Sequence, residues 1–129
     1  QLRTPDGLTV LVGRNNRQND LLISSVATDY DLWFHTQEIP GSHVLLRLEA
    51  GQVPSDEDMK YVADLSAYFS RARQADQVPV VYTQPKHVYK PKGALPGMVI
   101  YKHETVLWGQ PRRIEEQAAD AATPETTVV

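Results

Sequence analysis

Short apolar runs alternate with polar stretches along this chain of 129 residues. Runs of β-branched and aromatic residues, bounded by polar, Gly or Pro segments, are typical of β-strands. Pro79, near the start of the last such run, suits an edge strand or the first positions of a strand. The shorter run 21–23 fits either a strand or the start of a helical turn. The pattern predicts strands at residues 8–12, 32–35, 43–48 and 78–83.

The helical signals are strongest after Pro54. Ser55 is a good N-cap residue, and Asp58, three positions on, can complete a variant capping box. Acidic residues crowd the first turn, where the helix dipole favours anions. Apolar residues then recur at spacings of three and four, and arginines close the segment. We therefore predict a helix over 56–74, with an apolar face made of Val62, Leu65, Phe69 and Ala72.

The last third of the chain mixes irregular and regular patterns. Residues 86–96 are too rich in Pro, Gly and Lys for regular structure. The apolar runs 98–101 and 105–108, with His103 and Glu104 between them, predict a β-hairpin. From Pro111 onward, Ala, Thr and Glu prevail and no large apolar residue follows Ile114, which is typical of a solvated tail.

Several strands, one central helix and long polar loops indicate an α+β fold. We expect a single compact domain with a mainly antiparallel mixed sheet, one principal helix at about 56–74 and long polar loops. This domain would span 1–111, and 112–129 would form a flexible acidic, Thr-rich tail. Regular βαβ alternation and a glycine-rich phosphate loop are both missing, which argues against nucleotide-binding folds.

Composition and charge narrow the possible functions. The sequence has no cysteine, so it offers no disulfide, thiolate metal site or cysteine nucleophile. No apolar run approaches the ~20 residues of a membrane span, and no signal-peptide pattern opens the chain, so we expect no membrane partner and a cytoplasmic location. Residue 1 is Gln rather than Met, which suggests a piece of a longer protein. The net charge is −3, so polyanion binding would depend on local cationic stretches.

Residues 13–20 form one such stretch. Seven consecutive polar residues lie between two apolar runs, which is more than a turn requires. Arginine forks suit phosphates, and amides offer donors and acceptors to sugar or base edges. Alternatively, this segment is a solvated loop whose asparagines cap their own backbone. The candidate binding residues are Arg14, Asn15, Asn16, Arg17, Gln18, Asn19 and Asp20.

Two histidines bracket a Pro-Gly turn and could approach each other across neighbouring strands. Zinc takes three or four ligands and no HExxH-type spacing is present, so we expect neither a metal nor a cofactor. Acid–base catalysis by the pair lacks a nucleophile motif. We favour histidines that hydrogen-bond the loop backbone and order the turn, with binding as an alternative. The candidates here are His35, Thr36, Gly41, Ser42 and His43.

A second cationic stretch contains three lysines and no acid. Tyr82 and Tyr89 lie close to it in sequence. Lysine with interleaved tyrosine suits RNA, because bases stack on the rings and phosphates pair with the ammonium groups. An exposed loop kept soluble by lysine is the alternative. The candidate residues are Lys86, Lys90 and Lys92.

Four co-linear blocks of the sequence carry a family resemblance. Residues 12–20 read VGRNNRQND, and residues 31–35 and 39–43 read DLWFH and IPGSH. Residues 67–73 read AYFSRAR, and VVYT at 80–83 precedes VYKPKGALPGMV at 88–99. From about Gly7 to Pro111, these blocks resemble the NFACT-R domain, formerly DUF814, of the fibronectin-binding protein A-like and NEMF/Tae2-like proteins. Four ordered blocks make the resemblance specific.

The resemblance implies an RNA-binding module of ribosome-associated quality control. Proteins of this family bind obstructed large ribosomal subunits that carry peptidyl-tRNA and recruit tRNA for untemplated tailing. The implied partners are the large ribosomal subunit, rRNA and/or tRNA, and other domains of a longer parent protein. Arg17, Gln37 and Leu95 stand where the family often has lysine, which lowers the local charge.

We therefore expect a non-catalytic module that contacts rRNA or tRNA through the candidate residues of the two cationic stretches and the Pro-Gly turn. One alternative is an RNA- or nucleotide-processing enzyme that uses His35 and His43, and turnover lost on His43→Ala would favour it. Another is a fibronectin- or protein-binding interaction domain, which nuclease-insensitive binding to ribosome fractions would favour.

Overall fold

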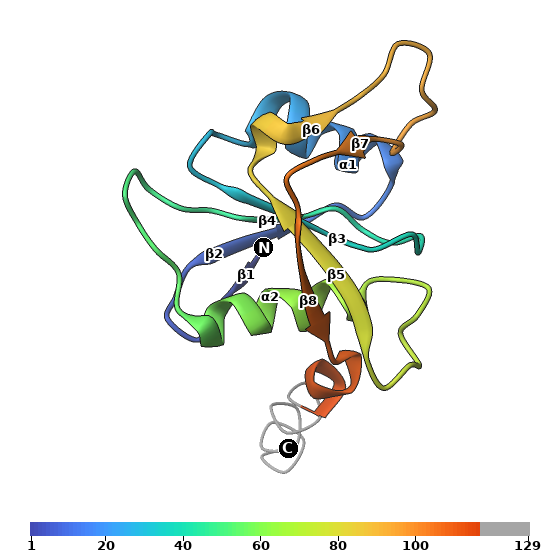
Figure 1. The fold of residues 1–129 in the computed structure, drawn as a ribbon. Helices are drawn as coiled ribbons and strands as arrows, with labels where there is room; N and C mark the ends of the chain where they lie inside the picture. Colours follow the sequence, from blue (N-terminus) through green and yellow to red (C-terminus); the bar gives the residue numbers. More distant parts are fainter. Residues whose placement is uncertain (117–129) are drawn as a thin grey trace, which may run out of the picture.

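A computed structural model describes residues 1–116 of the chain (Figure 1). Within this range six strands form an antiparallel sheet in the order β1-β2-β4-β3-β5-β8, and β6 pairs with β7 in a small second sheet. The α+β prediction is confirmed. The strands are β1 Leu2–Arg3, β2 Thr9–Val12, β3 Leu32–Thr36, β4 Val44–Leu46, β5 Val78–Thr83, β6 Val88–Tyr89, β7 Ile100–Tyr101 and β8 Thr105–Gly109. The helical elements are α1 Asn16–Leu21, the π-helical segment Leu22–Val26, α2 Asp56–Tyr68 and the 3-10 turn Pro85–His87.

The large sheet is covered on both faces. Adjacent residues of a strand point to opposite sides, so Phe34 and Val44 pack in one core cluster while Trp33 and Leu45 pack in another. Helix α2 covers the first face, and α1 with the β6 and β7 region covers the second (Figure 1). Burial on both faces explains why the strands appear in the sequence as continuous apolar runs.

Helix α2 begins as predicted and ends early. The Ser55 hydroxyl accepts the N–H of Asp58 at 3.0 Å and caps the first turn. The predicted helix over 56–74 is wrong beyond Tyr68. There the backbone turns to pair with the Pro-Gly turn: the Phe69 carbonyl accepts the Ser42 N–H at 2.9 Å, and the Arg71 N–H donates to the Pro40 carbonyl at 2.9 Å. These non-local bonds compete with further helical turns.

The predicted hairpin of 98–101 with 105–108 is wrong. Strand β7 pairs with β6, whereas β8 pairs with β5 at the edge of the large sheet. Tyr101 packs against Trp33, with 5.4 Å between ring centroids, and the Thr83 hydroxyl donates to the Lys102 carbonyl at 3.0 Å. These contacts hold the chain where it crosses between the sheets. The segment 86–96 was expected to be irregular, but its residues Val88–Tyr89 form the strand β6 and pair with β7.

The structure also decides two points for which the sequence allowed alternatives, the place of Pro79 and the structure of residues 21–23. Strand β5 lies between β3 and β8, so Pro79 takes one of the first positions of an interior strand rather than an edge. Residues 21–23 belong to the end of α1 and the π-helical segment, which matches the helical alternative.

The segment after Pro111 departs from the predicted solvated tail. Residues 111–116 are helical, and Ile114 joins the core cluster beneath α2. Arg113 Nε lies 3.6 Å from the buried Asp64 carboxylate, which also accepts the Gln110 N–H at 2.7 Å. The rest of the predicted tail, residues 117–129, lies outside the described residues.

Candidate nucleic-acid interface

The polar stretch 14–20 was predicted to be a loop, and most of it is helix α1 instead. The Asn15 side chain accepts the N–H of Gln18 at 2.9 Å, and the Gln18 side chain accepts the N–H of Arg14 at 2.7 Å. The first bond satisfies one of the N–H groups that a helix start leaves unpaired, and the second fixes the residue that precedes the N-cap. The alternative that asparagine caps its own backbone is therefore correct for Asn15.

Asn19 points inward from α1 and joins it to β4. Its side chain is buried, and its Oδ1 accepts the N–H of His43 at 3.1 Å. The Gly13 backbone passes so close that a Cβ there would lie 1.9 Å from Asn19 Oδ1. Glycine is required at position 13 because any side chain would displace this amide.

His43 is a structural residue at the centre of the second core. Only 1% of its surface is exposed. The Trp33 indole N–H donates to His43 Nδ1 at 3.2 Å, so the ring proton lies on Nε2, which donates to the Gly97 carbonyl at 3.1 Å. Burial lowers the pKa of His43 to about 4. The imidazole is therefore neutral at pH 7, with both nitrogens occupied.

His35 lies beside it and orders the Pro-Gly turn. Its ring stacks on Trp33 and meets His43 edge-on, with centroids 5.2 Å apart. Its Nδ1 and Nε2 lie 2.6 and 3.2 Å from the carbonyl oxygens of Thr36 and Gly41, and burial lowers its pKa. The Thr36 hydroxyl closes the same turn by donating to the Ile39 carbonyl at 2.7 Å. Both histidines thus make the backbone contacts that the sequence favours.

Lys90 and Asp20 fasten the segment 88–101, here called the arm, to α1. Lys90 Nζ lies 3.2 Å from Asp20 Oδ1 and donates to the carbonyls of Leu95 and Met98 at 2.7 and 3.2 Å. The same carboxylate oxygen accepts the N–H of Gly97 at 3.0 Å. The ammonium group of Lys90 is therefore engaged within the domain.

A hollow of about 320 Å³ opens where α1, the Pro-Gly turn and the end of α2 meet. Two arginines line it, no carboxylate does, and neither arginine forms an ion pair within residues 1–116. The Arg14 guanidinium lies over the Phe69 ring, 5.2 Å from its centroid. This chemistry fits an anion. The lining residues are Gly13, Arg14, Asn15, Asn16, Asn19, Pro40, Gly41, Ser42, Phe69, Ser70 and Arg71.

The structure divides the predicted binding residues into three groups. One group lines the hollow: Arg14, Asn15, Asn16, Asn19, Gly41 and Ser42. A second group makes internal contacts away from the lining: Gln18, Asp20, His35, Thr36, His43 and Lys90. The third is exposed and lies outside the lining: Arg17, Lys86 and Lys92.

Phe69, Ser70 and Arg71 are lining residues that the sequence analysis missed as a binding group. They were assigned to a continuous helix, which placed them on its core face or last turn. The available signal was the AYFSRAR block at 67–73, which carried part of the family resemblance but was assigned wholly to the helix.

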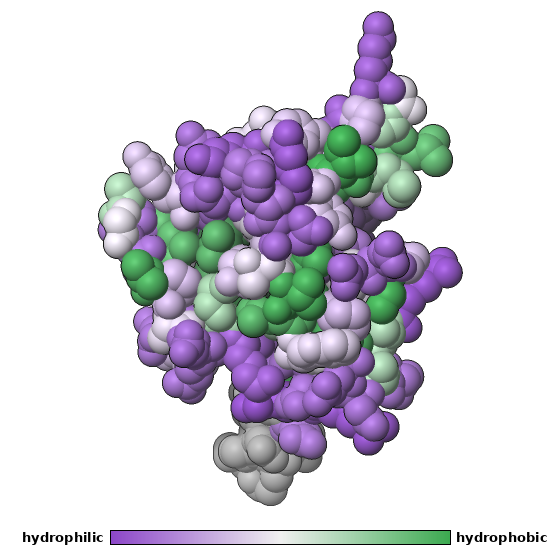
Figure 2. Space-filling view, in the orientation of Figure 1, coloured by the Kyte–Doolittle hydropathy of each residue, from purple (hydrophilic) through white to green (hydrophobic). Residues whose placement is uncertain are grey.

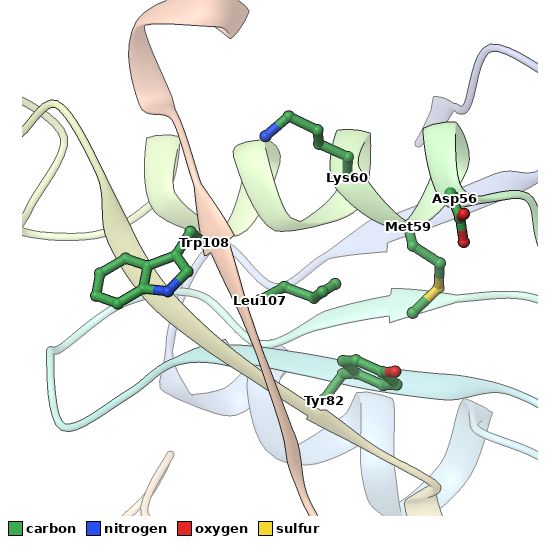
Figure 3. A pocket seen from close by; sticks show the side chains of 6 residues that line it. All are labelled: Asp56, Met59, Lys60, Tyr82, Leu107 and Trp108. Carbon is green, nitrogen blue, oxygen red and sulfur yellow. The ribbon is translucent and has the colours of Figure 1, made fainter.

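A second hollow, of about 370 Å³, has a different chemistry (Figure 3). Met59, Tyr82 and Leu107 converge on it from α2, β5 and β8, and Asp56 and Lys60 supply one charge of each sign. This apolar, charge-balanced lining does not select an anion. Within residues 1–116 no group of three or more His, Asp or Glu side chains could hold a metal ion. No helix in the same range is long and apolar enough to cross a membrane.

Comparisons with known proteins show which family the chain resembles. The family profile described as "NFACT protein RNA binding domain" matches residues 2–103. The "Rqc2 homolog RqcH" of Bacillus subtilis is 46% identical over 105 residues, and its counterpart in Streptococcus suis is 45% identical over 103. These alignments cover 81% and 79% of this chain but 18% of each relative. The chain thus spans a small part of the length of these relatives.

A solved structure shares the fold. It is described as the C-terminal of the fibronectin/fibrinogen-binding protein from Streptococcus suis, and it is 42% identical with a TM-score of 0.79. The match covers 84% of this chain and 43% of that one. The profile, the relatives and this structure agree with the four sequence blocks, and the chain belongs to the NFACT protein RNA binding domain family.

Proposed function

We propose that this domain is a non-catalytic RNA-binding module of a ribosome-associated quality control factor and that it grips RNA phosphates in the hollow beside α1. The observation that carries the proposal is a concave surface whose lining has no carboxylate and has two guanidinium groups that form no ion pair within residues 1–116. Membership of the NFACT RNA-binding family supports it. Phosphate contacts supply much of the affinity of RNA-binding surfaces, and the guanidinium group of arginine can donate two hydrogen bonds to one phosphate.

Arg14 and Arg71 would act as the two cationic walls. Because Arg14 lies over Phe69, its guanidinium plane is pre-positioned, and its N–H edge, which has no partner within residues 1–116, could meet a phosphate. The Asn16 amide and the Ser42 hydroxyl make no hydrogen bond within the described part of the chain, so they are available to the ribose 2′-hydroxyl or a base edge. Lys86 and Lys92 would add contacts outside the hollow.

The names of the relatives support a finer proposal. They are called Rqc2 homologues, so the RNA would be rRNA or tRNA on an obstructed large ribosomal subunit, and the compartment would be the cytoplasm. Other domains of a longer parent protein would share in that binding, since the relatives extend well beyond the matched region.

The enzyme alternative has little support from the geometry. A general base needs a free nitrogen within reach of the substrate. His43 is almost fully buried, and Trp33 and the Gly97 carbonyl occupy its two nitrogens. Both His35 nitrogens lie against backbone carbonyls. We therefore propose that the pair positions the turn.

The test is the salt dependence of RNA binding. We expect Arg14→Ala combined with Arg71→Ala to weaken binding to bulk tRNA and to lower the log–log salt slope by about two, one for each lost phosphate contact. Arg112→Ala is the matched control. Arg112 follows β8, is exposed, lies outside the hollow and forms an ion pair with Asp76. Filter binding at several salt concentrations measures both quantities. An unchanged slope in the double variant would contradict the proposed contacts.

A further inference from the structure

The arm contains a tight turn, residues 95–98, with apolar side chains at both ends. The Met98 N–H donates to the Leu95 carbonyl at 3.0 Å, and the two residues between them are Pro96 and Gly97. Gly97 has a φ of 82°, and proline followed by such a glycine is the pattern of a type II turn. The first and last residues of a β-turn lie close together, so Leu95 and Met98 are neighbours.

These apolar side chains face solvent. The exposed fractions of Leu95, Met98 and Ile100 are 71%, 59% and 59%. Hydrophobic atoms gather on the arm, at the upper right of the molecule, beside hydrophilic ones (Figure 2). Scattered exposed apolar residues are ordinary, but a cluster on one projecting element marks an interaction surface.

The turn is held rigidly. Lys90 donates to the carbonyls of both Leu95 and Met98, while Asp20 and His43 bind the N–H and the carbonyl of Gly97. A Cβ at Gly97 would lie 2.5 Å from Asn16 Oδ1, so the turn sits directly on α1. A pre-ordered surface loses less conformational entropy on binding than a mobile one.

The charged side chains of the segment that carries the cluster have one sign, and Asp20, which contacts the turn from α1, is engaged by Lys90. Residues 85–103 contain four lysines and no acidic residue. Lys90 is engaged internally, and Lys102 lies over the Tyr89 ring at 4.9 Å from its centroid, which leaves its charge at the surface. An apolar centre with a charged rim is the usual anatomy of a protein–protein interface. The complementary partner has an apolar patch edged by carboxylates.

We propose that the arm docks on such a protein surface within the same ribonucleoprotein particle whose RNA the hollow binds, an inference that rests on the proposed function. The apolar, non-aromatic side chains of the cluster favour a protein partner over RNA. RNA offers phosphates, sugars and flat bases, which suit cations and aromatic rings. Burying Leu95, Met98 and Ile100 together requires an apolar protein surface.

The experiment compares two probes: purified large ribosomal subunits, and RNA extracted from those subunits. We expect Leu95→Ser combined with Met98→Ser to weaken binding to subunits about tenfold and to leave binding to the extracted RNA unchanged. Val53→Ser is the matched control, since Val53 is 87% exposed and lies before α2. Circular dichroism checks that each variant is folded.

Equal weakening toward both probes would mean that the arm contacts RNA, and no weakening toward subunits would mean that it contacts nothing there; either result overturns the proposal. Arg14→Ala with Arg71→Ala should weaken both probes. If that variant binds both normally, the proposed function fails on its own account. A benzophenone side chain placed at position 100 gives an independent measurement: crosslinks to a polypeptide are expected, and crosslinks to RNA alone would be contradictory.

Discussion

At the scale of single residues, many polar groups of the family blocks form internal bonds rather than a free surface. Asn15 and Gln18 cap α1, Asn19 holds the backbone of His43, and His43 holds Gly97. Buried polar groups are costly unless they are paired, so these residues stabilise the site mainly by fixing its shape. The side chains left for a ligand are chiefly arginines at the rim of the hollow.

His43 should make the stability of the domain depend on pH. Its folded-state pKa of about 4 is below the ordinary 6.5, so between these values the unfolded chain binds the proton more readily. Stability is therefore full above about pH 6.5 and falls as the pH drops toward 4, by on the order of 3 kcal/mol in total. Urea unfolding followed by tryptophan fluorescence at pH 7.5, 6 and 5 measures this loss.

The variants separate His43 from other groups. His43→Gln should be less stable at pH 7.5 and should lose less stability between pH 7.5 and 5. His103→Gln, at an exposed histidine in the crossing between the sheets, is the control for a histidine substitution outside the core and should change the stability at pH 7.5 little. A wild-type curve that is flat from pH 7.5 to 5 would show that the buried imidazole does not resist protonation.

At the scale of elements, the site is an assembly of short pieces rather than a single motif. Helix α1 has six residues and the strands of the arm have two each, so neither would persist alone. They are stable because the arm and the π-helical segment that continues α1 pack on Trp33 and its neighbours, and because Lys90 and Asp20 join α1 to the arm.

Lys90→Ala should loosen the arm while the domain stays folded. The substitution removes an ion pair and two hydrogen bonds from a charged donor, which support the turn at Leu95–Met98. We expect amide hydrogens of residues 92–99 to exchange about tenfold faster, with exchange in α2 unchanged. Hydrogen exchange followed by mass spectrometry reads both regions.

Lys92→Ala is the control, because Lys92 is exposed and makes no such contacts within residues 1–116. It should weaken RNA binding slightly and leave exchange unaltered. If the two variants showed the same exchange in the arm, Lys90 would not be the group that fastens it.

At the scale of the whole molecule, one sheet organises two surfaces of different chemistry. The hollow is cationic and polar, and the surface formed by Leu95, Met98 and Ile100 of the arm is apolar with lysines around it. The net charge of −3 gives no sign of these two cationic regions, because it is a sum over the whole chain. The segment 110–116 completes the core on the opposite side, under α2.

Ile114→Ala tests whether that segment belongs to the cooperative unit. Ile114 packs in the same cluster as Val62 and Phe34, so its truncation should lower the free energy of unfolding by about 2–3 kcal/mol. Fluorescence and circular dichroism should still give coincident urea transitions. Glu116→Ala, at an exposed position of the same helical segment, should change stability little. An unaltered midpoint for Ile114→Ala would mean that the segment is not part of the folded core.

The local patterns predicted a good part of this molecule. The strand runs, the start of α2 at Ser55 and the α+β class followed from residue type and spacing, and the four blocks carried the family. The structure of residues 14–20 was predicted wrongly because Asn and Gln suit both loops and helix caps, and the bonds from the Gln18 N–H to Asn15 and from the Arg14 N–H to Gln18 show that a cap is present.

Residue type and spacing are enough to locate the apolar segments, the start of α2 and the four family blocks, because these depend on neighbouring residues. Where α2 ends, which strand β7 joins and which side chains meet at the hollow could be learned only from the folded molecule. Each of these depends on bonds between distant segments, such as Ser42 to Phe69 and Asp20 to Gly97. Folding also places Arg14 and Arg71 in the lining of one hollow, and no pattern along the chain predicts that convergence.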